Sequence, residues 1–205
     1  MRPRWLLLLF LSVRLDALQA PAVEAAREGV VLTRLPSILT DKEVRKHLET
    51  GLTTSFVFET RALGTGAPVK GGARVDIRYE LWDEVYIVSR VDANGRAART
   101  TFPSFGHLDQ WWRDARLAVL RPPPPANARI EIRLRVIPFS QTEQLETQRW
   151  FSQALSGEVS GSAGAASGES ESFGQFLNLL IATSIGRPAL LEYEWNLTIP
   201  PGKKR

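Results

Sequence analysis

Apolar and polar residues alternate strictly through the middle of the chain. Residues 75–81 alternate four apolar with three charged side chains, and residues 85–91 continue with the same period of two. That period is typical of strands with one buried face. The triplet at residues 82–84 interrupts the first alternation, and Asn94-Gly95, a pair that accepts positive φ at both centres of a type I′ turn, follows the second. The pattern predicts a three-stranded antiparallel meander.

Further strands are predicted on both sides of this meander. Residues 129–137 and 190–199 alternate in the same way, with branched or aromatic residues on one face and charged or amide residues on the other. Residues 52–63 are rich in strand-forming types, with Phe56 and Phe58 on one face and Val57 on the other. The short apolar run at 30–35 predicts one more strand, and residues 64–72 are expected to form a glycine-rich loop.

One helix is predicted before the meander and one after it. Thr40 and Glu43 have capping-box spacing, and a helix is expected from residue 41 until Gly51 stops it. Ser104 opens a second helix. Its apolar residues have near-helical spacing as far as four consecutive prolines at 122–125, and they are Leu108, Trp111 or Trp112, Ala115 and Val119.

The last third of the chain predicts two helices separated by a linker. Ser140 and Glu143 repeat the capping-box spacing and begin a helix to about residue 155, and residues 173–185 form a short buried helix. Residues 156–172 are mainly Gly, Ser and Ala and have little to bury. Ordering them would cost about 1–2 kcal/mol per residue, so we expect a flexible insertion.

Together these elements predict an α+β domain: a mostly antiparallel sheet of six or seven strands, with helices packed on one face. A β-sandwich with peripheral helices is the alternative. The length of 205 residues and the 43% hydrophobic content allow one full core, so a single domain is expected over residues 26–205.

Residues 1–25 have the layout of a secretory signal peptide. Arg2 and Arg4 precede the apolar run at 5–13, small residues follow it, and cleavage is expected after Ala25. The run is too short for the roughly 20 residues that span a bilayer, so no transmembrane span is predicted. An uncleaved end with weak membrane association is the alternative. The expected location is the periplasm or the cell envelope.

Composition excludes several classes of function. The net charge of +4 comes from basic residues that are scattered along the chain, which is not the pattern of a nucleic-acid surface. Arg greatly outnumbers Lys, which indicates a GC-rich bacterial genome. The chain contains no Cys, so neither a thiol nucleophile nor a disulfide is possible.

The order of these segments resembles an uncharacterised family of exported bacterial proteins, the domain of unknown function 4390. The resemblance covers roughly residues 28–155. It rests on the segments EVRKHLETG, LTTSFVFET, IRYELWDEVYIV, FPSFGHLDQWW and RIEIRLRVIPFS. It implies export and this type of fold, and it assigns no catalytic residue.

Catalytic and cofactor chemistry has few candidates. His47 and His107 are far apart in sequence and give no metal-ligand spacing, and the glycines at 64–72 precede a strand, where no helix N-terminus binds a phosphate. No catalytic residue, cofactor or metal site is therefore predicted. The alternative is a hydrolase that uses carboxylates such as Asp83 and Glu84, with His107, in a cleft not visible from the sequence.

Tryptophan is the most informative residue type, with six copies in the chain. Trp82 falls at a predicted turn, and the adjacent Trp111 and Trp112 lie 100° apart on a helix, so both cannot point straight at the core. An exposed tryptophan marks a partner surface, although a broad helix face can half-bury both. We therefore predict a non-enzymatic envelope domain that binds a protein partner or an apolar ligand through Trp82 and Trp112.

Overall fold

The computed structural model describes residues 18–64, 67–125, 127–138 and 188–200 as two antiparallel sheets with two α-helices. In chain order the elements are β1 (Ala22–Ala26), β2 (Gly29–Thr33), a 3₁₀ turn η1 (Ile38–Thr40), α1 (Lys42–Leu48), β3 (Thr54–Leu63), β4 (Val69–Glu80), β5 (Val85–Val91), β6 (Ala97–Phe102), α2 (Phe105–Asp114), β7 (Leu117–Leu120), β8 (Arg129–Pro138) and β9 (Leu191–Thr198).

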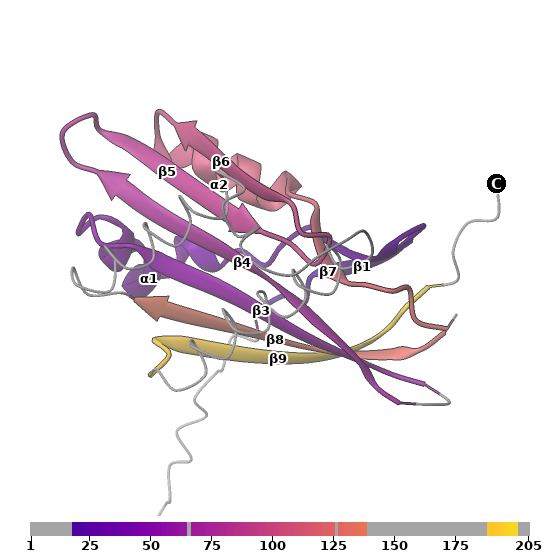
Figure 1. Ribbon diagram of the computed structural model, residues 1–205. Helices are drawn as coiled ribbons and strands as arrows, with labels where there is room; N and C mark the ends of the chain where they lie inside the picture. Colours follow the sequence, from indigo (N-terminus) through magenta and orange to yellow (C-terminus); the bar gives the residue numbers. More distant parts are fainter. Residues whose placement is uncertain (1–17, 65–66, 126, 139–187, 201–205) are drawn as a thin grey trace, which may run out of the picture.

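Six strands form the larger sheet in the order β6-β5-β4-β3-β8-β9, and every neighbouring pair is antiparallel (Figure 1). The predicted meander is present as β4-β5-β6, and β3 lies inside the sheet between β4 and β8. The α+β class, the antiparallel sheet and its strand number are thus confirmed. A second sheet, in the order β1-β2-β7, was not predicted.

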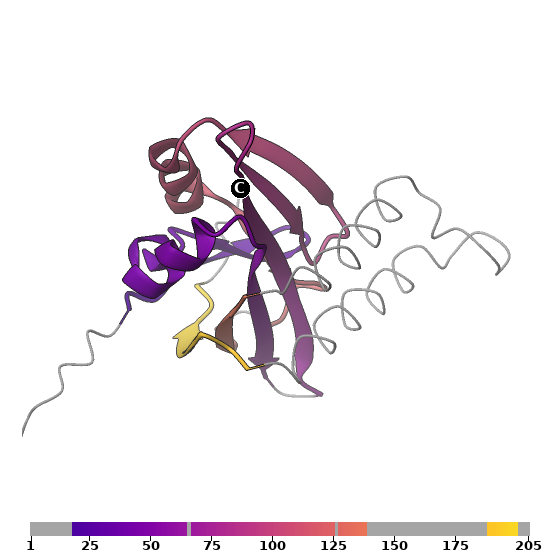
Figure 2. The same cartoon turned by 90° about the vertical axis from the view of Figure 1, so that its left-hand side faces the viewer.

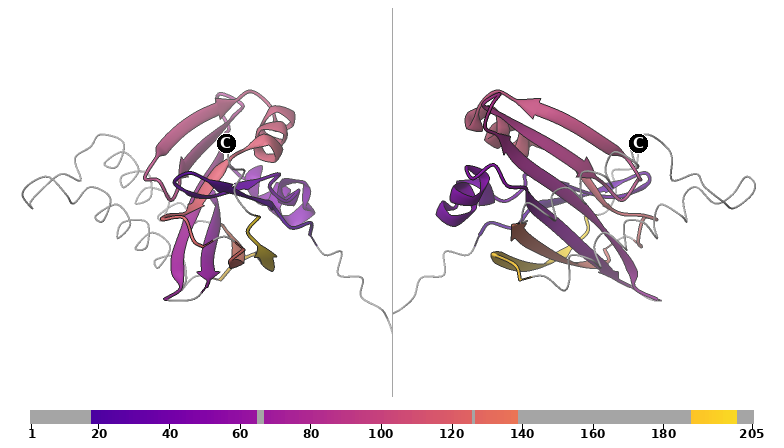
Figure 3. Two further views of the ribbon diagram at one scale, coloured as in Figure 1. Left: turned by 90° about the vertical axis from the view of Figure 1, so that its right-hand side faces the viewer. Right: turned by 60° about the vertical axis from the view of Figure 1, so that its left-hand side comes forward.

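Both helices and the small sheet lie on one face of the large sheet (Figures 2 and 3). Alternate residues of the six strands point into this layer, which makes it the main core. Its fully buried members include Phe56, Phe58, Ile77, Leu108, Ile130 and Leu134. Neither helix of the described residues is long and apolar enough to cross a membrane.

Asp41, and not the predicted Thr40, caps α1. The Asp41 carboxylate accepts hydrogen bonds from the backbone N–H groups of Glu43 and Val44, at 2.9 and 3.1 Å. The Thr40 hydroxyl donates instead to the carbonyl oxygen of Ser37 within the 3₁₀ turn. Both residue types make good caps, so the sequence pattern alone left the boundary open by one residue.

The helix predicted from Ser104 to Val119 is shorter than expected. Ser104 caps α2 as predicted, but α2 ends at Asp114, and the apolar run LAVL forms β7, which pairs with β2. All four residues of β7 are buried, so their periodicity fits a helix as well as a strand. Pairing with β2, a distant segment, decides between the two.

The predicted glycine loop at 64–72 is also shorter, because β4 already begins at Val69. A Cβ atom on Gly71 would lie 2.5 Å from the carbonyl oxygen of Val119 in β7. Gly71 is therefore a strand residue that allows two backbones to approach closely, and not part of a flexible loop.

The β5–β6 turn differs in type from the prediction. Gly95 has a φ of 78°, but Asn94 is not among the residues with positive φ. The Gly95 N–H donates to the Asp92 carbonyl oxygen, and the Asp92 carboxylate accepts from the N–H groups of Asn94 and Arg96. This is a type I turn followed by a left-handed glycine, which replaces the predicted type I′ turn.

The N-terminal strand β1 occupies residues assigned above to the signal peptide. It pairs with β2 along its whole length, and Glu24 forms an ion pair with Arg116 at 2.7 Å. The predicted cleavage site after Ala25 therefore lies within β1. The helices predicted at 140–155 and 173–185 and the insertion at 156–172 lie outside the described residues.

Trp112 is a core residue and not the surface contact that the sequence suggested. Its side chain is fully buried, with ring centroids 4.8 Å from Phe56 and 6.2 Å from Phe58. Its indole N–H donates to the carbonyl oxygen of Pro36 at 2.8 Å. The residue thus joins α2 to β3 and to the segment that precedes η1.

Truncating Trp112 should destabilise the fold strongly. We expect Trp112→Ala to lower the free energy of unfolding by about 3–5 kcal/mol, because it removes a large buried ring. Trp112→Phe should cost less, since it mainly leaves the Pro36 carbonyl without its donor, a loss of about 1–3 kcal/mol. Urea titration measures both. The exposed Trp82→Ala is the control, expected within about 0.5 kcal/mol of the wild type; a Trp112→Ala protein of unchanged stability would contradict the assignment.

Candidate functional site

The tip of the β4–β5 hairpin carries an exposed apolar pair. Trp82 is 93% exposed and Leu81 is 59% exposed, and these are the large hydrophobic side chains that the described residues leave exposed. The hairpin ends at one end of the large sheet, at the upper left of Figure 1. Trp82, one of the two contact residues proposed from the sequence, is thus at an exposed position.

Aromatic packing holds this tip from below. Tyr79 and Tyr86, which are paired across the hairpin, have ring centroids 4.8 Å apart, and Tyr86 contacts the Phe105 ring of α2 edge-on. The guanidinium of Arg45 in α1 lies 4.3 Å from the centre of the Phe105 ring, a cation–π geometry. The tip is thus mounted on two strands and two helices, which keeps its position fixed relative to the core.

Gly51 and Glu84 shape the backbone around the tip. Gly51 has a φ of 77°, and a Cβ atom there would lie 3.1 Å from the Cδ1 atom of Leu81, so Leu81 rests against this glycine. Glu84 has a φ of 53°, which is uncommon for a residue with a side chain and reverses the chain between the strands. The Trp82 side chain, by contrast, extends into solvent.

The tip carries net negative charge. Asp83 and Glu84 are exposed, and neither forms an ion pair with another described residue. Glu80, at the end of β4, is paired with Arg78 at 3.0 Å, and its side chain is only 25% exposed. The result is an apolar pair with two uncompensated carboxylates on its rim.

Trp111 and His107, the other candidates in this region, belong to α2. Trp111 is half-buried against Phe102 of β6, with ring centroids 5.4 Å apart. The His107 Nδ1 atom is 2.7 Å from the Ser104 hydroxyl at the start of the helix. His107 is thus engaged in helix capping.

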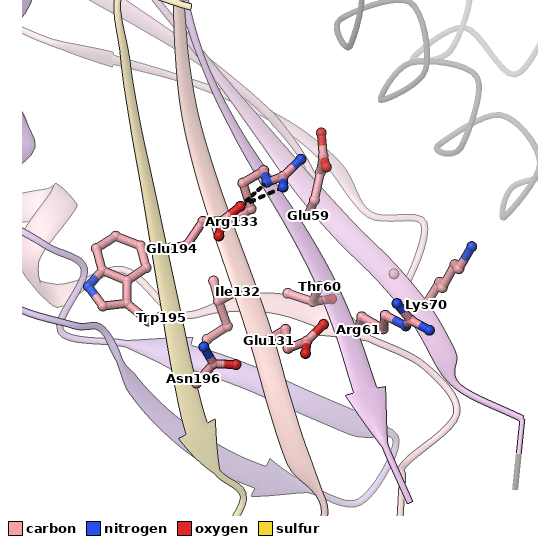
Figure 4. A pocket seen from close by; sticks show the side chains of 11 residues that line it. Glu59, Thr60, Arg61, Lys70, Glu131, Ile132, Arg133, Glu194, Trp195 and Asn196 are labelled. Atoms are coloured by element: carbon pink, nitrogen blue, oxygen red, sulfur yellow. Dashed lines mark hydrogen bonds and ion pairs between the residues drawn. The ribbon is translucent and has the colours of Figure 1, made fainter.

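A cleft of about 530 Å³ lies on the opposite face of the large sheet, across β4, β3, β8 and β9 (Figure 4). Strand register places its side chains in rows, with Glu59 opposite Arg133 and Arg133 opposite Glu194. The described residues that line the cleft are Glu59, Thr60, Arg61, Lys70, Gly71, Glu131, Ile132, Arg133, Glu194, Trp195 and Asn196. Asp83, Glu84 and His107 are not among them.

Three carboxylates and three cations balance the charge of this cleft. Arg133 pairs with Glu194 at 2.5 Å and with Glu192 at 3.3 Å. Burial raises the pKa of Glu59, while Arg133 and Arg135 act in the opposite direction. One Glu59 carboxylate oxygen is buried without a hydrogen-bond partner, so no donor offsets the loss of hydration that raises this pKa. In the described residues, no group of three or more His, Asp or Glu side chains is arranged to bind a metal ion.

The cleft residues were identified only in part by sequence reasoning. The alternation placed Glu131, Arg133 and Glu194 on the polar face of their strands, but it did not reveal that β8 pairs with β3 and β9. Glu59 stands next to Phe58 in a run of strand formers and gave no chemical signal. Cross-strand order, which comes from tertiary pairing, is what brings these residues together.

Comparison of the chain with protein-family models, with curated proteins and with solved structures found no match. The resemblance to the domain of unknown function 4390 therefore stays a prediction.

Replacing Glu59 with glutamine should stabilise the protein at neutral pH. The raised pKa means that the folded state favours the protonated carboxyl, so its contribution to stability is present below pH 4.5 and is lost as the pH rises through the folded pKa. Because Glu59 is only half-buried, solvent screening keeps the gain small. We expect a rise of at most a few degrees in the thermal midpoint at pH 7, since about 1 kcal/mol corresponds to about 2–4 °C in a chain of this size.

The same comparison at pH 3.5 is the control, where the two proteins should unfold at the same temperature. A glutamine variant that is less stable at pH 7 would show that attraction to Arg133 outweighs the burial of the carboxylate.

Proposed function

We propose that this protein is a non-enzymatic domain of the cell envelope that binds a protein partner through the tip of the β4–β5 hairpin. The observation that carries the proposal is the 93% exposure of Trp82 on a fixed hairpin, beside the exposed Leu81. Tryptophan is the side chain most enriched among residues that dominate binding energy, and a pre-positioned ring loses little conformational entropy on binding.

Shape favours a protein partner over a small apolar ligand. Small-molecule sites are concave and largely apolar, and they enclose most of the ligand. The tip is convex, and the cleft on the sheet is lined mainly by charged side chains such as Glu59, Arg61 and Lys70. A projecting tryptophan fits an apolar socket on a partner, with the remaining contacts forming a rim around it.

Charge favours a basic rim on that socket. Asp83 and Glu84 follow Trp82 directly, and neither forms an ion pair with another described residue. Contact with an anionic bilayer would place these carboxylates against like charge. Lys or Arg residues around the partner's socket would instead attract them and increase the rate of association.

Export of the domain is the second part of the proposal, and it rests on the N-terminal sequence. The charged start, the apolar run at 5–13 and the small residues after it are the features of a signal peptide. A cut after Ala25 would remove four of the five residues of β1, and with them the ion pair between Glu24 and Arg116. Cleavage before Ala22 is compatible with both the signal and the strand.

Crosslinking from position 82 tests the hairpin tip. A photoreactive phenylalanine analogue at position 82 should give one discrete crosslinked species in intact cells, whereas the same analogue at Glu28, in the exposed β1–β2 turn, should give none. With the captured partner purified, Trp82→Ala should weaken binding by at least about 30-fold, the effect of losing about 2 kcal/mol at a hot spot. Trp82→Phe should retain most of the affinity.

Three results would refute this use of the tip. They are unchanged affinity in Trp82→Ala, equal crosslinking from both positions, and Trp82-dependent binding to vesicles of phosphatidylethanolamine and phosphatidylglycerol in place of a protein.

The mature N-terminus tests export. Intact mass measurement on protein purified from the envelope fraction should show a chain that begins at or before Ala22 and has lost the apolar run. A mature start at Ala26 would show that β1 is dispensable, and full-length protein confined to the cytoplasm would refute export.

A further inference from the structure

Strand β9 leaves one edge of the large sheet open. It pairs with β8 on one side, and no other strand of the described residues pairs with its second side (Figure 1). Among the described residues, β9 is the longest edge strand, with eight residues. The other edge strands are β6 with six, β1 with five and β7 with four. An open edge presents backbone donors and acceptors that can pair with another strand.

The direction of the backbone hydrogen bonds shows which residues of β9 face the open side. The Ile199 N–H donates to the Ala128 carbonyl oxygen at 3.0 Å, in continuation of the β8–β9 register. The N–H and C=O groups of one residue point to the same side of an antiparallel strand, and the direction alternates from residue to residue. The odd-numbered residues of β9 therefore bond to β8. Four even-numbered residues point their backbone groups to the open edge, and they are Glu192, Glu194, Asn196 and Thr198.

The inward face of β9 offers an incomplete apolar row. Leu191, Tyr193, Trp195 and Leu197 are all half-buried, whereas the inward residues of β3 and β8 are almost completely buried. Tyr193 and Trp195 stack with ring centroids 5.9 Å apart and an angle of 10° between their planes. The Trp195 indole N–H already donates to the Leu18 carbonyl oxygen at 3.2 Å, and a strand added beside β9 would cover the part of the row that Leu18 leaves exposed.

Charged side chains on the outward face of β9 favour one sign of charge on the strand that pairs with it. Glu192 and Glu194 are the charged residues of β9. They pair with arginines of β8, yet their side chains remain 44% and 59% exposed. Opposite charges in directly facing positions stabilise a strand pair, and like charges destabilise it. The open edge therefore favours a strand with Lys or Arg at its outward positions.

We propose that β9 binds an extended segment of a partner protein as a seventh strand of the large sheet, and that this segment alternates apolar with basic residues. Main-chain hydrogen bonds to the even-numbered residues supply affinity, while the apolar row and the two glutamates supply selectivity. A second copy of this chain is the weaker occupant, because the sequence LEYEWNLT contains no cation and would add two more glutamates to the same row.

Hydrogen exchange on the full chain tests this proposal, with a synthetic eight-residue peptide of alternating valine and lysine as the probe. In the free protein, the backbone amides of Glu192, Glu194, Asn196 and Thr198 should exchange fast and those of the odd-numbered residues slowly. Saturating peptide should slow exchange of the four even-numbered amides by at least about tenfold. The same peptide N-methylated at alternate residues, so that it cannot donate to the edge, should give no protection.

Variants separate the backbone from the charge contribution. Asn196→Pro removes an outward N–H without touching the β8 ladder and should weaken peptide binding by at least about tenfold. Thr101→Pro, in the edge strand β6, is the matched control. The Asp92 N–H donates to the Arg96 carbonyl oxygen, so even-numbered residues of β6 bond to β5. The Thr101 N–H therefore points to the outward side of β6. This variant should leave binding unchanged. The double variant Glu192→Gln, Glu194→Gln should also weaken binding, and more strongly at low salt than at high salt.

Several outcomes would overturn the proposal: even-numbered amides that are already protected in the free protein, equal binding of the N-methylated peptide, or equal binding by Asn196→Pro. Protection that appears with rising protein concentration and no peptide would identify a second copy as the occupant. Trp82→Ala should leave peptide binding unchanged, so failure at this edge and failure at the hairpin tip are distinguishable.

Discussion

The close approach of β7 to its neighbours is the constraint on which the arrangement of both sheets depends. A Cβ atom at Gly71 of β4 would lie 2.5 Å from the Val119 carbonyl oxygen, and one at Gly29 of β2 would lie 1.8 Å from that of Leu120. Side-chain carbon atoms do not approach backbone oxygens so closely, so both positions require glycine. The Thr60 hydroxyl donates to the same Val119 oxygen at 2.7 Å and fixes β7 over β3. The small sheet can therefore close one end of the core without an intervening layer of side chains.

The position of Trp112 depends on the contact of β7 with β3 and β4. Only two residues separate α2 from β7, so the place of β7 determines where α2 lies over the large sheet. The Trp112 ring then fills the space above Phe56 and Phe58, and Pro36 accepts its N–H. A buried indole needs such an acceptor, which explains why the polar backbone at Pro36 enters an apolar core. Trp82 has no comparable partner in the described residues, and this contrast distinguishes a structural tryptophan from a candidate binding residue.

Local patterns in the sequence were sufficient to predict most strands of the large sheet. Alternation predicted the meander, β8 and β9 closely, and it assigned Val57 to the face opposite Phe56 correctly. The errors occurred where tertiary contact decides between local alternatives: β7 was assigned to a helix, Gly71 to a loop, and Trp112 to the partner surface. Each of these segments depends on a partner that is distant in sequence. For the candidate site, the turn that carries Trp82 was predictable from the break in the alternation, whereas the cleft and the open edge depend on strand order, which no local pattern contains.

The outward face of the sheet explains how β9 can stay in register while its edge remains open. Arg133 forms ion pairs with Glu194 and Glu192, and Arg135 pairs with Glu192. These ion pairs hold β9 against β8 on the outward face. A slip by one residue would turn the half-buried aromatic row outward and these charges inward, which makes any other register unfavourable. Edge strands are commonly protected from further pairing by lysine, by proline or by a bulge. Strand β9 contains neither lysine nor proline, and its glutamates oppose an acidic strand more strongly than a basic one. The residues that fix β9 in the fold are therefore the same residues that restrict what can be added to it.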